Sequence, residues 1–252
     1  MKKNKIIIFS PHFDDALISC GGLINNKLRK LESLNIVTIF SGKPDYKNIS
    51  NFAATIANDA WVERRAQENR RVLKSLNIEI KNLDFLDAIF RRNDKNENIC
   101  ISWSDVFSGN RKKINKETKL IVEIKKKINK IVDATSGEVY FPLSLGSHID
   151  HVLINIIGQE LSLSHKNLAV YFYEDLPYAD QVSATDKVFS DYRVAKVEKI
   201  NISKKLAGIV KYKCGLEVGD DARSKMHRIK KYAASISLGR NYQERFWKYI
   251  KK

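Results

Sequence analysis

The stretch IIIFSPHFDD, residues 6–15, joins a short apolar run to a polar, acid-rich loop. The four residues Ile6–Phe9 are the kind of β-branched apolar run found in buried parallel strands. Residues 16–30 follow with helix-compatible composition and apolar side chains at Leu17, Leu23, Ile24 and Leu28. A strand, a loop and a helix in this order predict the first unit of an α/β fold.

The same alternation continues along the chain. Strands are predicted at 35–40, 78–86, 138–143 and 168–173, and helices at 60–76, 119–132 and 152–163. Residues 93–116 are polar and show no clear pattern, whereas the chain from residue 203 onward is predicted to be helical in two pieces, broken at 215–221. Alternating strands and helices indicate a Rossmann-like, mostly parallel sheet with helices on both faces.

Neither an internal repeat nor a Gly/Ser/Pro-rich linker divides the chain. We therefore expect a single domain over residues 1–252, whose basic end at 189–252 is mostly helical. With 43% hydrophobic and 29% charged residues, the composition excludes collagen-like and disordered classes.

The cysteines and the N-terminus bear on the compartment. Cys20, Cys100 and Cys214 are far apart and form no CxxC pair, which argues against a disulfide framework and a Cys-based zinc site. The apolar run at 6–9 is too short for a secretion signal, and no stretch approaches the roughly 18 apolar residues that span a bilayer. We therefore expect a cytoplasmic protein.

Two short segments combine histidine with adjacent acids. The first is residues 10–15, SPHFDD, and the second is residues 146–151, GSHIDH; together they hold three of the five histidines. Loops that leave the carboxyl ends of parallel strands emerge at one edge of a sheet, so we expect the two segments to meet. Imidazole and carboxylate are usual zinc ligands, and catalytic zinc sites commonly use three of them plus an open position.

The spacing within each segment supports a metal site. His12 and Asp15 are three residues apart, as are His148 and His151, so each pair can face one direction on a first helical turn. Either segment alone could be a helix cap, but the two together favour a metal site. The nearby Gly21-Gly22 lacks the G-x-G-x-x-G order, so it predicts close helix–sheet packing rather than dinucleotide binding.

These motifs resemble those of the zinc-dependent PIG-L (LmbE-like) de-N-acetylases. The resemblance lies in PHFDD at 11–15, the glycines at 21–22 and HIDH at 148–151, with support from TIFSGKP at 38–44, RAQE at 65–68 and YEDLPY at 173–178. It covers residues 4–180 and matches the basic C-terminal part only loosely. Phe13 and Ala16 stand where the family often has Pro and Glu.

The resemblance implies that His12, Asp15 and His151 bind zinc. A His₂–Asp set also suits Fe(II), so the residues alone leave the metal open. Zinc is favoured because the implied reaction is a hydrolysis without redox change: the metal lowers the pKa of a water molecule and polarises the carbonyl of an N-acetyl group.

The resemblance also implies roles for three further residues. Asp14 would be the general base, and His148 the general acid or the electrostatic partner of the oxyanion, with Asp150 orienting His148. The implied activity is removal of acetyl from an N-acetylated amino sugar or sugar conjugate. Nothing in the residues selects among free, nucleotide-linked, lipid-linked or natural-product acceptors, and the oligomeric state is not readable from them.

Arg65 and Asp87 are the candidate substrate contacts. The alternative for Arg65 is a surface pair with Glu68, and for Asp87 a turn or cap role. A competing class is a non-catalytic Rossmann-like module that binds an anionic ligand or nucleic acid. A two-metal phosphohydrolase is disfavoured because the motifs hold too few carboxylates.

The net charge of +16 says little about the class of binding partner. The 32 lysines outnumber the 13 arginines, and from Phe189 onward 17 basic residues face 6 acidic ones. No aromatic stripe accompanies this basic end, so no nucleic-acid partner is expected. A positive surround instead favours an anionic small-molecule substrate, with a rate that falls as salt is added.

Overall fold

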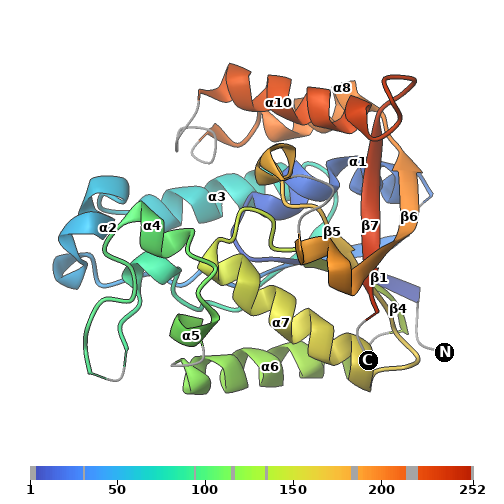
Figure 1. The fold of residues 1–252 in the computed structure, drawn as a ribbon. Helices are drawn as coiled ribbons and strands as arrows, with labels where there is room; N and C mark the ends of the chain where they lie inside the picture. Colours follow the sequence, from blue (N-terminus) through green and yellow to red (C-terminus); the bar gives the residue numbers. More distant parts are fainter. Residues whose placement is uncertain are drawn as a thin grey trace.

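A seven-stranded sheet in the order β3-β2-β1-β4-β5-β7-β6 organises the computed structural model (Figure 1). The structure describes residues 4–30, 32–93, 95–114, 117–133, 136–182, 187–213 and 221–250. The strands are β1 (Asn4–Ser10), β2 (Ser33–Thr38), β3 (Glu79–Asn82), β4 (Ser136–Pro142), β5 (Ala169–Tyr173), β6 (Tyr192–Lys199) and β7 (Gln243–Tyr249). Strands β1 to β5 are parallel, whereas β7 pairs antiparallel with β5 and with β6. The predicted mostly parallel sheet is confirmed.

Helices cover both faces of this sheet (Figure 1). The longer ones are α1 (Asp15–Arg29), α3 (Trp61–Lys74), α6 (Thr118–Asp133), α7 (Ile149–Ser164), α8 (Ile202–Ile209) and α10 (Ala222–Ser235). Shorter pieces are η1 (Tyr46–Asn48), α2 (Asn51–Ile56), η2 (Ala88–Phe90), α4 (Trp103–Val106), α5 (Arg111–Ile114), η3 (Tyr178–Gln181) and η4 (Lys187–Asp191). None of the described helices is long and apolar enough to cross a membrane.

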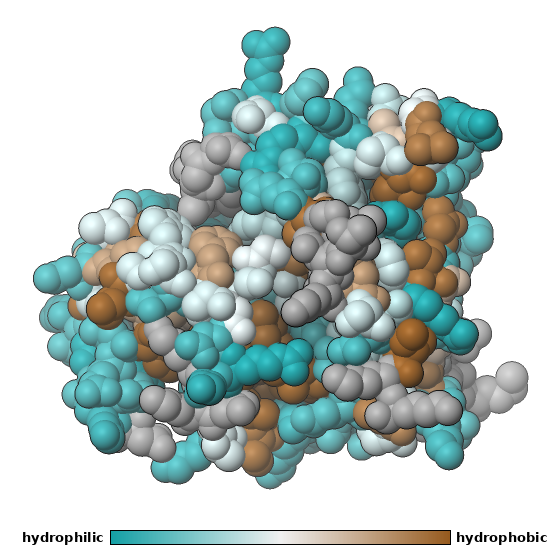
Figure 2. Space-filling view, viewed as in Figure 1, coloured by the Kyte–Doolittle hydropathy of each residue, from teal (hydrophilic) through white to brown (hydrophobic). Residues whose placement is uncertain are grey.

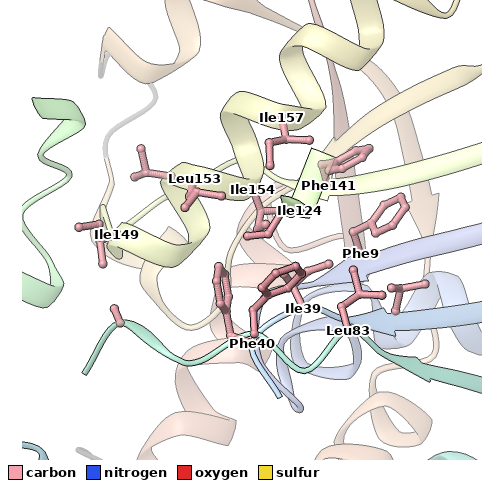
Figure 3. Packing of buried hydrophobic residues seen from close by; sticks show 14 of the residues in the cluster. Phe9, Ile39, Phe40, Leu83, Ile124, Phe141, Ile149, Leu153, Ile154 and Ile157 are labelled. Carbon is pink, nitrogen blue, oxygen red and sulfur yellow. The ribbon is translucent and has the colours of Figure 1, made fainter. Parts of the chain in front are cut away.

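The alternating residues of β1 divide the core between the two faces. Ile7 and Phe9 belong to the cluster that includes α6 and α7, where Phe9 stacks on Phe141 with ring centroids 4.6 Å apart (Figure 3). Ile6 and Ile8 belong to a second cluster formed with α1 and α3. The apolar run that begins the chain therefore anchors the helices of both layers. Hydrophilic residues cover most of the face shown in Figure 2.

The predicted elements differ from the observed ones mainly at their ends. Helix α7 begins at Ile149, three residues earlier than predicted, which makes His148 its N-cap and places His151 in its first turn. The polar region at 93–116 contains the short helices α4 and α5. Residues 215–220 of the predicted helix break lie outside the described part of the chain.

The expectation that residues 189–252 are mostly helical is wrong. Helices α8 and α10 are present, but the described part of this segment also contains β6 and β7, which complete the sheet, and connecting loops. In β7 the inward positions hold Glu244 and Phe246, so the apolar alternation that marks a strand is interrupted by a charge. Most residues of β6 are exposed, so its sequence lacks the alternation of buried apolar residues that marks a strand.

A buried ion pair connects this C-terminal region to the middle of α1. Glu244 of β7 accepts hydrogen bonds from the backbone N–H groups of Gly22 and Leu23, both at 2.8 Å. Lys205 of α8 donates to Glu244 at 2.6 Å and to the carbonyl of Ser19 at 3.2 Å. A Cβ on Gly22 would overlap Ile200 and approach Glu244, so this glycine is required for close packing, as the sequence predicts.

Removing the lysine of this pair should destabilise the protein strongly. We expect Lys205→Met to lower the free energy of unfolding by about 3–5 kcal/mol, because Glu244 would remain buried without its countercharge. Lys43→Met is the matched control: Lys43 pairs with Glu63 at 2.6 Å, but its side chain is 67% exposed, so a loss below about 1 kcal/mol is expected. Urea unfolding of both variants gives the comparison, and equal losses would contradict the assigned importance of the buried pair.

Candidate metal centre

The two histidine-containing segments meet where the strand order reverses. Strands β2 and β3 lie on one side of β1, and β4 and β5 lie on the other, so the crevice between β1 and β4 is the topological switch point of the sheet. His12 follows β1 and His148 follows β4. Their ring centroids are 4.8 Å apart, although the two segments are far apart in the chain. The predicted meeting of the segments is what the structure shows.

His12, Asp15 and His151 form a compact, buried set of donors. Asp15 Oδ2 lies 3.3 Å from His12 Nδ1 and 3.2 Å from His151 Nε2. One donor atom from each residue lies within 4.8 Å of the other two, which suits a single metal ion. Three protein donors of this chemistry match a catalytic site with an open position.

His12, His148 and Asp150 form a second set that is equally close. Its donors are engaged elsewhere: Asp150 accepts from Arg91 at 2.6 Å, and the Nδ1 atom of His148 accepts from the backbone N–H of Asp150 at 3.2 Å. The set with Asp15 is therefore the better metal site.

Buried carboxylates contact both histidines of the set with Asp15. Asp175, at the end of β5, lies 2.6 Å from Nδ1 of His151 and accepts from the backbone N–H of Leu145 at 2.9 Å. Asp150 lies 3.1 Å from Nε2 of His12. Such contacts fix the tautomer and direction of a metal-binding imidazole.

The resemblance implies that Asp150 orients His148, and the backbone of Asp150 makes the hydrogen bond between the two residues. The carboxylate contacts His12, Arg91 and the backbone N–H of Ala88, and only the backbone N–H of Asp150 reaches His148. Arg91 also binds Glu117 through two hydrogen bonds of 2.7 and 3.2 Å. Burial alone would raise the pKa of Asp150, but Arg91 keeps that pKa below its usual value.

The charges at the centre favour a cation. Burial alone would lower the pKa of His12, yet Asp87, Asp15 and Asp150 raise it well above the ordinary value. Burial would also lower the pKa of His151, but Asp15 and Asp175 raise this pKa to about 9. Burial would raise the pKa of Asp15, but His151 and His12 lower it. The carboxylates thus draw positive charge to the imidazoles, and a divalent cation would supply that charge, so these residues fit a metal.

Asp14 lies beside this centre without belonging to the three-donor set. It is the N-cap residue of α1, is buried, and accepts a hydrogen bond of 2.8 Å from Arg65. The Arg65 guanidinium also lies 4.6 Å from the Trp61 ring centroid. Glu68 lies against Arg71 and the backbone of Lys213 instead, so the alternative pairing of Arg65 with Glu68 is wrong.

A cavity of about 650 Å³ opens onto these residues. His12, Asp14, Asp15 and His148 line it, together with both substrate-contact candidates, Arg65 and Asp87. Asp87 Oδ2 lies 3.3 Å from His12 Nε2, and burial raises the pKa of Asp87. The structure therefore brings every predicted site residue to one cavity or to the cluster directly behind it.

Several residues at this site were not predicted from the sequence. Asp175 sits in the YEDLPY stretch at 173–178, and its place after a predicted strand is the signal that could have identified it. Arg91 carries no such signal, because its partners Asp150 and Glu117 are distant in sequence. Trp103 and Phe107 line the cavity from a segment without a clear pattern.

Comparisons with known proteins show what the chain is similar to. Residues 7–162 match the PIG-L family model, which describes GlcNAc-PI de-N-acetylase. A 2'-N-acetylparomamine deacetylase of Niallia circulans is 26% identical over 196 residues, 71% of this chain and 69% of that protein. One of Streptomyces fradiae is 27% identical over 190 residues, 74% of this chain and 62% of that protein, less than two thirds of its length. The zinc-inhibited form of a teicoplanin deacetylase has a TM-score of 0.81 at 22% identity, with 97% of each chain covered, which shows a shared fold.

Proposed function

The chain belongs to the PIG-L family of de-N-acetylases, and from this premise we propose that it removes the acetyl group of an N-acetylated amino sugar or sugar conjugate at a divalent metal held by His12, Asp15 and His151. The observation that carries the proposal is a compact set of three buried candidate donors, two of which, His12 and Asp15, line the cavity together with Asp14, which stays outside the donor set. Zinc is the proposed metal, since hydrolysis of an amide requires no redox change. Fe(II) is the alternative that the same donors allow.

A bound divalent metal would lower the pKa of a water molecule and polarise the amide carbonyl. Asp14 would accept the proton of this water as general base. Arg65 binds Oδ1 of Asp14, so Oδ2 is the oxygen we assign to the proton transfer. Arg65 and Asp87 would contact the sugar from the cavity wall.

His148 would donate a hydrogen bond to the oxyanion that develops on the carbonyl. Because Nδ1 of His148 accepts the backbone N–H of Asp150, the neutral ring carries its proton on Nε2. A donor fixed in this way stabilises charge as it forms. Asp14 would then return its proton to the departing nitrogen while the C–N bond breaks, which yields acetate and a free amine.

Acetate release from N-acetylglucosamine-type substrates tests this function. The metal-loaded protein should release acetate, a chelator should abolish the release, and zinc should restore it. A broad metal titration is needed, because a relative of this fold has a zinc-inhibited form. Acetate release that persists after complete metal removal would overturn the proposal.

The carboxylate behind His151 should matter for metal affinity. We expect Asp175→Asn to raise the metal Kd by about 10–100-fold, because the ring loses the charged partner that orients it. Asp133→Asn is the matched control, since Asp133 lies 3.2 Å from the surface residue His165. Competition with a chromogenic chelator measures both variants; equal Kd values would show that Asp175 does not support the ligand.

Two features of the substrate and the setting stay predictions. A cytoplasmic location is one, and an anionic substrate drawn in by the basic surface is the other. The second is checked by comparing charged and neutral substrates at rising ionic strength, where only the charged one should slow markedly.

A further inference from the structure

The cavity is larger than one sugar requires. At roughly 30 Å³ per water molecule, its volume of about 650 Å³ corresponds to about 20 non-hydrogen atoms that are not bonded to one another. An N-acetylhexosamine has about 15 non-hydrogen atoms. Because covalent bonds hold these atoms closer together than neighbouring water molecules, the sugar fills less of the cavity than the same number of waters would. The volume also falls in the range of pockets that bury drug-sized ligands. The substrate therefore has room for a second group beside the sugar.

A row of aromatic rings leads outward from the metal centre. The Phe107 ring lies 5.3 Å from that of His148, edge to face. Trp103 follows at 6.0 Å from Phe107 with an interplanar angle of 27°, and Phe52 lies 5.5 Å beyond Trp103. Trp103 begins α4 and Phe107 is its C-cap residue four positions later, so their rings share one side of the helix. The row connects the proposed oxyanion donor to the outer part of the cavity.

Trp103 forms an exposed platform within this row. Its side chain lines the cavity, yet 47% of the residue is open to solvent, and Ile101 beside it is 67% exposed. The side chain of Ser102 caps α4 by accepting from the backbone N–H of Asp105, which fixes the helix that carries the ring. A preorganised, exposed aromatic face of this kind is typical of a binding surface.

The lining of the cavity combines two kinds of chemistry. Ile56, Trp103 and Val106 form an apolar wall. Lys225 and Arg228 also line the cavity, and Arg228 is bound by Asp180 through two hydrogen bonds of 2.6 and 2.7 Å. An apolar group would thus lie against Trp103 and its apolar neighbours, because Ile56 and Val106 offer the hydroxyl groups of a second sugar no hydrogen-bond partners.

We propose that the N-acetylated sugar carries an aromatic aglycone that stacks on the indole face of Trp103. This inference rests on the proposed deacetylase function and names the class of substrate for it. A flat ring matches the flat indole, and the parallel arrangement of Trp103 and Phe107 continues the stack toward the sugar. An alkyl chain would use the apolar wall without using the ring planes.

The test compares phenyl, hexyl and methyl glycosides of N-acetylglucosamine with the same anomeric configuration. The wild-type kcat/KM should be about tenfold higher for the phenyl than for the methyl glycoside, with the hexyl glycoside well below the phenyl. Trp103→Ala should remove most of the phenyl advantage, and Trp103→Phe should restore part of it. Leu238→Ala is the control, because Leu238 is 88% exposed and lies outside the cavity.

The outcomes separate the two proposals. Equal kcat/KM for phenyl and methyl glycosides, an equal rate for hexyl and phenyl, or an equal loss for both substrates in Trp103→Ala would overturn the aromatic aglycone. Absence of acetate release from every glycoside would overturn the deacetylase function instead. Calorimetric titration of the metal-loaded protein with the phenyl and methyl glycosides then still tests Trp103: tighter phenyl binding that Trp103→Ala removes supports the stacking site, and equal binding overturns it.

Discussion

Asp14→Asn should lower kcat/KM for deacetylation by about 10³-fold while the protein keeps its metal. Asparagine has nearly the shape of aspartate, and its amide oxygen can still accept the hydrogen bond from Arg65, which is 2.8 Å long in the structure. It cannot accept a proton from water, and loss of a general base typically costs 10²–10⁴-fold. Steady-state acetate release, with metal content measured in parallel, checks this result.

The control for this variant is the same substitution at an aspartate that lies away from the cavity. Asp59 is exposed just before α3, so Asp59→Asn should leave both rate and metal content unchanged. If Asp14→Asn retains more than about a tenth of the activity, another group takes the proton and the assignment of the base is wrong. If it loses the metal as well, Asp14 belongs to the donor set.

His151→Ala should abolish stoichiometric metal binding and with it the activity. The imidazole lies between Asp15, at 3.2 Å, and Asp175, at 2.6 Å. The substitution removes one of the three proposed donors. It also leaves the carboxylates of Asp15 and Asp175 buried without the imidazole that lies between them. We expect the metal Kd to rise by more than 100-fold, beyond the effect of losing a supporting contact.

Thermal unfolding gives a readout of this loss that does not need a substrate. Metal that binds only the folded state stabilises it, by about 2.7 kcal/mol at a free concentration of 100 times Kd, so a chelator should lower the Tm of the wild type. The chelator should leave the Tm of His151→Ala unchanged. His165→Ala, at a surface histidine, should respond like the wild type. A chelator effect on the Tm of His151→Ala as large as in the wild type would exclude His151 as a ligand.

The parts of the site that the sequence predicts are those that depend on strand ends. His12 and Asp15 directly follow an apolar run, and His151 follows the next strand across the switch point, so topology alone brings them together. The partner of Asp150 could not be predicted this way. Its carboxylate contacts Arg91 and His12, because buried charges from three separate segments of the chain determine its orientation.

The fold shows the same division. Strands β1, β2, β4 and β5 are rich in apolar residues, and β3 (EIKN) lies within the predicted segment 78–86, whereas β7 places the charged Glu244 at an inward position. That charge is stable there only because Lys205 and the N–H groups of α1 surround it. A single-sequence pattern counts Glu244 as an outward residue, since its compensating contacts lie elsewhere in the sequence: Lys205 is 39 positions away, and the N–H groups of α1 are more than 200 positions away.

The contact between Glu244 and α1 also sets an order of events during synthesis. Gly22 and Leu23 leave the ribosome early, but the carboxylate that binds their N–H groups is made 222 and 221 positions later. At about 5–20 residues per second, this interval is roughly 10–45 s. The helix that begins with Asp15 is thus translated early, and its contact with Glu244 forms late. A nascent chain stalled before residue 244 would lack this support for the loop at 10–15, which carries the proposed metal ligands.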